Sequence, residues 1–80
     1  MAKKIPVWDK FHKEIIQWIE VERYELGDIL YKILEECFDG ILDIRKEEET
    51  FHILIKVGTK VMSEYFLFFD KDEIVIEKHQ

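Results

Sequence analysis

The sequence predicts an α+β domain of order ααββββ, in which a two-helix hairpin packs on one face of a four-stranded antiparallel β-meander. Two observations favour this fold. Before Gly40 the apolar residues recur every three or four positions, which is the period of an amphipathic helix. After Gly40 they alternate with polar residues, which is the period of a half-buried strand. We therefore expect helices in the first half of the chain and a sheet in the second.

The first helix is predicted to run from about Pro6 to Leu26. Pro6 suits the first turn of a helix because its missing N–H has no partner there. Asp9 would then lie near the positive end of the helix dipole. The apolar stripe of this helix comprises Trp8, Phe11, Ile15, Ile16, Trp18 and Ile19.

The second helix is predicted to begin directly after a tight joint at Gly27. Gly27 fits the left-handed position just past a helix end, and Asp28 is a suitable N-cap for the next helix. Apolar pairs then recur every four residues up to Gly40: Ile29/Leu30, Ile33/Leu34 and Cys37/Phe38. The two helices would form a hairpin.

Four strands are predicted around residues 42–44, 51–57, 61–69 and 74–76, separated by charged or glycine-containing turns. Gly58 would supply a positive φ in the turn between the second and third strands. The segment 61–69 also matches helical spacing, so a third helix is the alternative there. We favour a strand because the segment is rich in aromatic residues and is bracketed by turns.

Composition predicts one small domain in a reducing, cytoplasmic setting. The 80 residues leave no room for two domains, and Cys37 is the single cysteine. Charges soon after Pro6 argue against a signal peptide, and no apolar run reaches the roughly 20 residues of a membrane span. We therefore expect a soluble protein.

No residue pattern indicates catalysis, a metal or a cofactor, so we predict that the protein is not an enzyme. The histidines His12, His52 and His79 are far apart in sequence, and we interpret them as unrelated rather than as zinc ligands. Cys37 continues an apolar stripe, which favours packing over a nucleophilic role. The acidic run at residues 70–73 is too short for a calcium loop and is typical of a turn.

The net charge of −6 is uneven along the chain. Residues 1–13 have four lysines against Asp9, a balance of +3. Residues 14–49 have twelve acids against four bases, a balance of −8, and residues 50–80 have five acids against four lysines, a balance of −1. We expect the acidic middle to meet a basic surface of a partner protein, through Glu20, Glu22, Glu25, Asp28, Glu35, Glu36 and Asp39.

These features predict a non-catalytic protein–protein interaction module, and its size and acidity match, by composition only, small phage or mobile-element inhibitors of a larger protein. Two helices would cover one face of the sheet, so apolar residues on the other face predict a homodimer: Leu54, Met62, Phe66, Phe68 and Val75. The alternative function is a nucleic-acid-associated regulator using Lys3, Lys4, Lys10 and Lys13. Direct binding to nucleic acid is disfavoured by the acidic middle.

Overall fold

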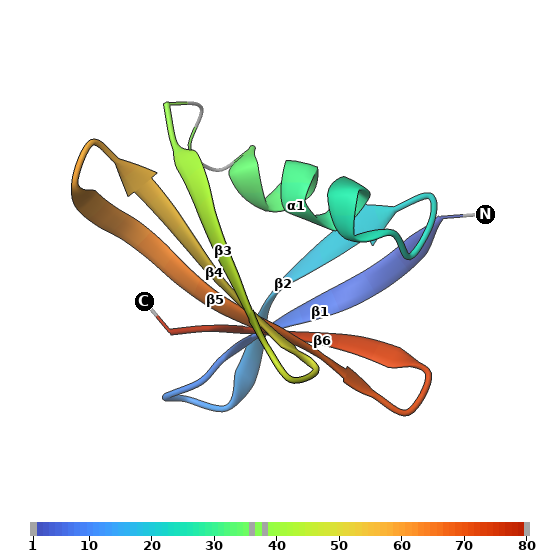
Figure 1. Ribbon diagram of the computed structural model, residues 1–80. Helices are drawn as coiled ribbons and strands as arrows, with labels where there is room; N and C mark the ends of the chain where they lie inside the picture. The colour runs from blue at the N-terminus through green and yellow to red at the C-terminus, as the bar shows by residue number, and fades with distance from the viewer. Residues whose placement is uncertain (1, 36, 38, 80) are drawn as a thin grey trace.

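The computed structural model describes residues 2–35, 37 and 39–79, and this part of the chain is mostly a six-stranded mixed sheet with one short helix (Figure 1). The elements are β1 (Lys3–Asp9), β2 (Glu14–Val21), α1 (Leu26–Leu34), β3 (Ile41–Glu47), β4 (Thr50–Val57), β5 (Lys60–Asp70) and β6 (Glu73–Lys78). The strand order is β2-β1-β6-β5-β4-β3, with β1 and β6 parallel and all other neighbours antiparallel. The predicted two-helix hairpin on a four-stranded meander is therefore wrong.

A β-hairpin, β1–β2, replaces the first predicted helix. Ile5 and Val7 on β1 and Ile19 and Val21 on β2 are all buried, and in each pair the two residues are two positions apart. Two-residue spacing places each pair on one face of a strand, and burial of these β-branched side chains outweighs the helical spacing. Pro6 is tolerated because β6 pairs with β1 from Val7 onward.

Asp9 closes the turn between β1 and β2 instead of starting a helix. Its Oδ1 accepts hydrogen bonds from the backbone N–H groups of Phe11 (2.8 Å) and His12 (3.1 Å), and its Oδ2 lies 2.9 Å from Nδ1 of His12. Lys13 takes a left-handed φ of 54° and donates its N–H to the Asp9 carbonyl oxygen. The His12 hydrogen bond lowers the pKa of Asp9, and the same contact raises the pKa of His12.

The helix α1 begins at Leu26 and continues through Gly27 and Asp28, so the predicted break at Gly27 is wrong. The apolar pairs after Asp28 do lie on this helix, and Ile29 and Ile33 are its buried residues. The helix ends at Leu34, well before Gly40. Cys37 lies in the connection that follows, and the predicted helical residues Glu36 and Phe38 fall outside the described residues.

The predicted four-stranded meander is present as β3–β4–β5–β6, paired in sequence order. Because β5 covers residues 60–70, the strand prediction for this segment is confirmed and the helical alternative is wrong. The turns between these strands contain left-handed residues, namely Glu48 (φ 56°), Gly58 (φ 64°) and Lys71 (φ 59°). The positive φ predicted for Gly58 is confirmed.

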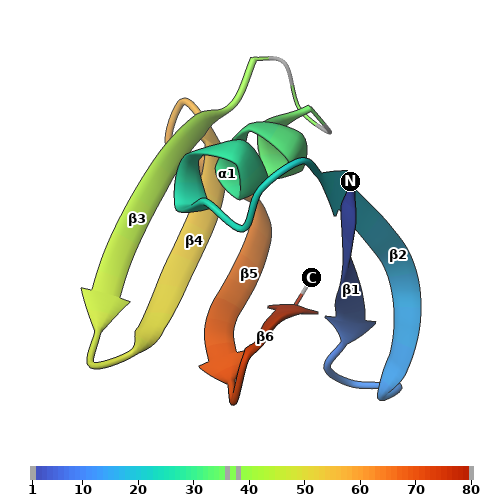
Figure 2. The ribbon, with the colours of Figure 1, turned by 90° about the vertical axis from the view of Figure 1, so that its right-hand side faces the viewer.

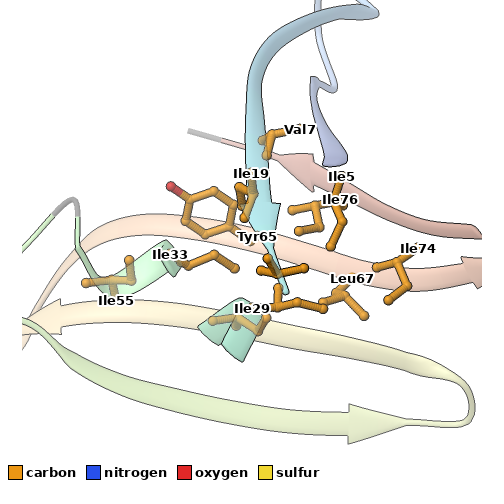
Figure 3. Packing of buried hydrophobic residues seen from close by; sticks show 12 residues of the cluster. Ile5, Val7, Ile19, Ile29, Ile33, Ile55, Tyr65, Leu67, Ile74 and Ile76 are labelled. Atoms are coloured by element: carbon orange, nitrogen blue, oxygen red, sulfur yellow. The ribbon is translucent and has the colours of Figure 1, made fainter. Parts of the chain in front are cut away.

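The sheet is strongly twisted and curved, and α1 lies in its hollow (Figures 1 and 2). We call the side that meets α1 the core face and the opposite side the outer face. Buried side chains of the core face pack with Ile29 and Ile33 (Figure 3). This cluster consists of Ile5, Val7, Ile19, Val21, Ile29, Ile33, Ile53, Ile55, Tyr65, Leu67, Ile74 and Ile76.

Gly40 brings the chain from the connection after α1 onto the core. A Cβ atom at this position would lie 2.6 Å from Cγ2 of Ile55 and 3.1 Å from the carbonyl oxygen of Cys37. Ile55 is fully buried, so it has little space in which to move aside. Glycine is required here by close packing, whereas Gly27 has no atom within 4 Å of its Cβ position.

Candidate interaction surface

Strand alternation places a second set of large apolar residues on the outer face. On β1 and β2, Pro6 pairs with Trp18 and Trp8 pairs with Ile15, while the buried Ile5, Val7 and Ile19 lie on the core face. On β5 and β6, Phe68 pairs with Val75. The outer apolar surface is defined here as Pro6, Trp8, Ile15, Trp18, Leu54, Phe66, Phe68 and Val75.

The aromatic side chains of this surface differ in exposure. Trp18 is 56% exposed, whereas Trp8, Phe66 and Phe68 are half-buried by their neighbours in the sheet. Phe11, in the β1–β2 turn, is 73% exposed. Because α1 lies in the hollow on the opposite side (Figure 2), none of the described elements covers the outer face. Aromatic side chains left in solvent on an uncovered face are typical of binding surfaces.

The surface of the described residues has several shallow clefts, among them one of about 430 Å³ and a smaller one of about 300 Å³. The smaller cleft lies on the outer face. Trp8, Phe68 and Val75 supply the apolar lining of the smaller cleft. Its charged lining includes Lys10 and Lys13 as well as acidic groups. The parallel pairing of β1 with β6 creates this cleft, because it brings Trp8 beside strands from the far end of the sequence.

Two histidines flank Phe66 on the outer face. The His52 ring stacks on Phe66 with centroids 4.4 Å apart, and the His79 ring lies on Phe66 with centroids 4.3 Å apart. Both imidazoles approach Glu64: Nε2 of His52 is 3.1 Å from Oε2, and Nδ1 of His79 is 3.7 Å from Oε1. The interpretation of the histidines as unrelated is therefore wrong for this pair. Burial lowers the pKa of His79, and the positive charge of Lys10 acts in the same direction.

Within the described ranges, no group of three or more His, Cys, Asp or Glu residues is arranged to hold a metal ion. Asp43 accepts a 2.8 Å hydrogen bond from Nζ of Lys56, and this contact lowers the pKa of Asp43. Cys37 is half-buried against the core. Among the residues described, no helix is long and apolar enough to cross a membrane.

The acidic residues predicted to bind a partner are divided among several places. Glu20, Glu22 and Asp28 line one surface hollow together with Arg23 and Lys32. Two further acids form ion pairs with these bases: Glu25 with Arg23 at 3.5 Å, and Glu35 with Lys32 at 3.9 Å. Asp39 is exposed beyond α1, and Glu36 lies outside the described residues. The surface where these acidic residues were predicted to bind a basic partner therefore has mixed charge.

The four lysines of the nucleic-acid alternative are also separated. Lys3 and Lys4 lie at the start of β1, whereas Lys10 and Lys13 lie in the turn after its end. A seven-residue strand spans roughly 23 Å, so the two pairs are distant from each other. Lys3 is further engaged over the ring of Tyr24, 4.8 Å from its centroid.

Of the residues predicted for self-association, Leu54, Phe66, Phe68 and Val75 lie on the outer face, and Met62 is exposed on β5 near the β4–β5 turn. The sequence interpretation missed Trp8, Ile15 and Trp18 for this surface because it assigned them to a helix. The alternation of Ile5 and Val7 with Lys4, Pro6 and Trp8 was the signal that indicates a strand.

Comparisons of the chain with protein-family models, with curated proteins and with solved structures gave no match. The residues and their arrangement are therefore the basis for a proposal of function.

Proposed function

We propose that this chain is a non-catalytic protein-interaction module, that its docking surface is the outer apolar surface, and that a second copy occupies this surface in a dimer. The observation that supports the proposal is Trp18, which is 56% exposed and belongs to an aromatic sheet face without a covering element among the described residues. A self-complementary patch suffices for a symmetric dimer, which is the commonest oligomer.

Burial of the exposed aromatic side chains of this surface would favour association. Removing the exposed part of Trp18 from water buries roughly 130 Å² and stabilises a complex by about 3 kcal/mol. Phe68, Trp8 and Val75 add smaller amounts because they are already half-buried. Tryptophan is also the residue type most enriched among interface positions that dominate binding energy.

The outer apolar surface is a better basis for the proposal than the acidic residues. Glu20, Glu22 and Asp28 share their hollow with Arg23 and Lys32, which partly neutralise them. Binding to a basic partner and inhibition of a larger protein stay predictions from composition. The basic N-terminal segment stays the alternative, and filter binding to duplex DNA at low and moderate salt tests it.

Sedimentation of Trp18→Glu tests the proposal. Trp18 is exposed, so the variant should fold, and we expect it to be monomeric at concentrations at which the wild type is dimeric. Tyr31→Glu is the matched control, because Tyr31 is an aromatic residue that is 66% exposed on α1, away from the outer face. Circular dichroism checks that both variants fold. An unchanged dimer in Trp18→Glu, or a monomeric wild type at tens of micromolar, would contradict the proposal.

A further inference from the structure

The helix α1 is too short to cover the whole core face. Its nine residues span roughly 14 Å, whereas the eleven residues of β5 span roughly 36 Å when extended. In Figure 2 the helix lies across the upper part of the hollow, and the lower ends of β3, β4 and β5 extend beyond it. Apolar residues of the core face therefore continue beyond the first turn of α1, toward the β3–β4 and β5–β6 turns.

A cleft of about 430 Å³ lies at this uncovered end. Its floor consists of core side chains, because Ile29, Leu67 and Ile74 line it and are at most 4% exposed. Figure 3 shows these three side chains close to one another. The remaining lining residues are Tyr24, Leu26, Lys46, Glu49, Phe51 and Phe69. Its size and apolar lining are typical of sites for small molecules.

The polar groups at the mouth favour an anion. Nζ of Lys46 lies 5.6 Å from the ring centroid of Phe51 and forms no ion pair with any described residue. A second ammonium, that of Lys3, lies over the ring of Tyr24, another lining residue. Glu49 is the one acid among the described lining residues. Two aromatic residues of the lining, Tyr24 and Phe51, therefore each have a lysine ammonium over the ring, and Lys46 is the one of these lysines that lines the cleft itself.

We propose that this cleft binds a small amphipathic anion. The apolar body lies on Ile29, Leu67 and Ile74, and the anionic head group pairs with the Lys46 ammonium. The site is on the core side of the sheet and is separate from the outer apolar surface, so it adds a ligand to the proposed interaction function rather than restating it. An uncharged or cationic molecule of the same length would gain the apolar contact without the ion pair.

Titration with octanoate and with octylammonium, both far below micelle-forming concentrations, tests the proposal by two-dimensional amide NMR. We expect octanoate to shift the amide signals of Phe51, Leu67 and Ile74 and to bind at least threefold more tightly than octylammonium. Lys46→Met keeps an unbranched apolar side chain without the charge, and it should weaken octanoate roughly threefold to fivefold. Lys60→Met, at the exposed β4–β5 turn, is the matched control and should leave the affinity unchanged.

Four results would overturn the proposal. Equal affinities for the two probes would remove the role of charge, and an unchanged affinity in Lys46→Met would remove the role of that lysine. Shifts centred on Trp8 and Phe68 would place the ligand on the outer face instead. A lack of shifts at millimolar octanoate would mean that the cleft takes no such ligand. None of these results alters the sedimentation of the wild type, so this proposal fails independently of the proposed dimer.

Discussion

Gly27→Ala is the substitution that separates the observed helix from the two-helix hairpin that the sequence predicts. In the structure Gly27 has a helical backbone within α1, is exposed, and has no atom within 4 Å of the position a Cβ would take. Alanine has the higher helix propensity and also restricts the unfolded chain. We therefore expect the variant to be stabilised by about 0.5–1 kcal/mol, which raises the melting temperature by roughly 2–8 °C at this chain length.

Gly40→Ala is the counterpart with the opposite sign. Its Cβ would meet the buried Ile55 at 2.6 Å, so we expect a loss of about 1–3 kcal/mol from overpacking. Urea unfolding followed by tryptophan fluorescence measures both free energies of unfolding. Were Gly27 a left-handed residue at the end of a helix, alanine there would cost about 1–2 kcal/mol. A destabilised Gly27→Ala variant would thus refute a helix that begins at Leu26.

Three further predictions concern a turn, the half-buried His79 and the cysteine. Glu48→Gly should stabilise the protein by about 0.5–1 kcal/mol in urea unfolding, because φ is 56° there; a loss of stability would contradict this. Because the folded-state pKa of His79 is lowered from 6.5, its stabilising contribution is complete above pH 6.5 and is lost as the pH falls below it. Unfolding between pH 8 and 5 should therefore depend less on pH in His79→Gln, and an unchanged profile would argue against burial of this ring. Cys37→Ala should cost about 1 kcal/mol through lost packing and leave sedimentation unchanged; altered self-association at normal folding would give Cys37 another role.

The sequence predicts the second half of the fold well because its signals there are local. Residues 51–57 alternate strictly, and Gly58 marks the turn that joins β4 to β5. The aromatic side chains of residues 61–69 fit a strand with two apolar faces, which is what β5 is: Tyr65 and Leu67 are buried on the core face, whereas Phe66 and Phe68 lie on the outer face. The strands and the turn at Gly58 can therefore be predicted from neighbouring residues, whereas the burial of Tyr65 and Leu67 also depends on packing with distant elements.

The first half depends on contacts between distant parts of the chain, and the prediction fails there. Trp8, Ile15 and Trp18 have helical spacing, yet β1 is stabilised by β6 from the other end of the sequence. Asp9 is compatible with a helix start and with a turn. In the structure its carboxylate accepts hydrogen bonds from the backbone N–H groups of Phe11 and His12, and these bonds stabilise the turn. The outer apolar surface could be predicted only for β4–β6, since its β1–β2 part exists only when these residues form strands.

The most direct test of the proposed interaction is an isotope-filtered NOE experiment on a mixture of labelled and unlabelled wild-type copies. Every contact it detects joins two molecules, so it identifies the surface that mediates association. We expect intermolecular NOEs from the rings of Trp8, Trp18 and Phe68, because these side chains would meet across the dimer. Intermolecular NOEs confined to α1 or to the β3 edge, or a complete lack of them in a monomeric sample at tens of micromolar, would contradict the proposed docking surface.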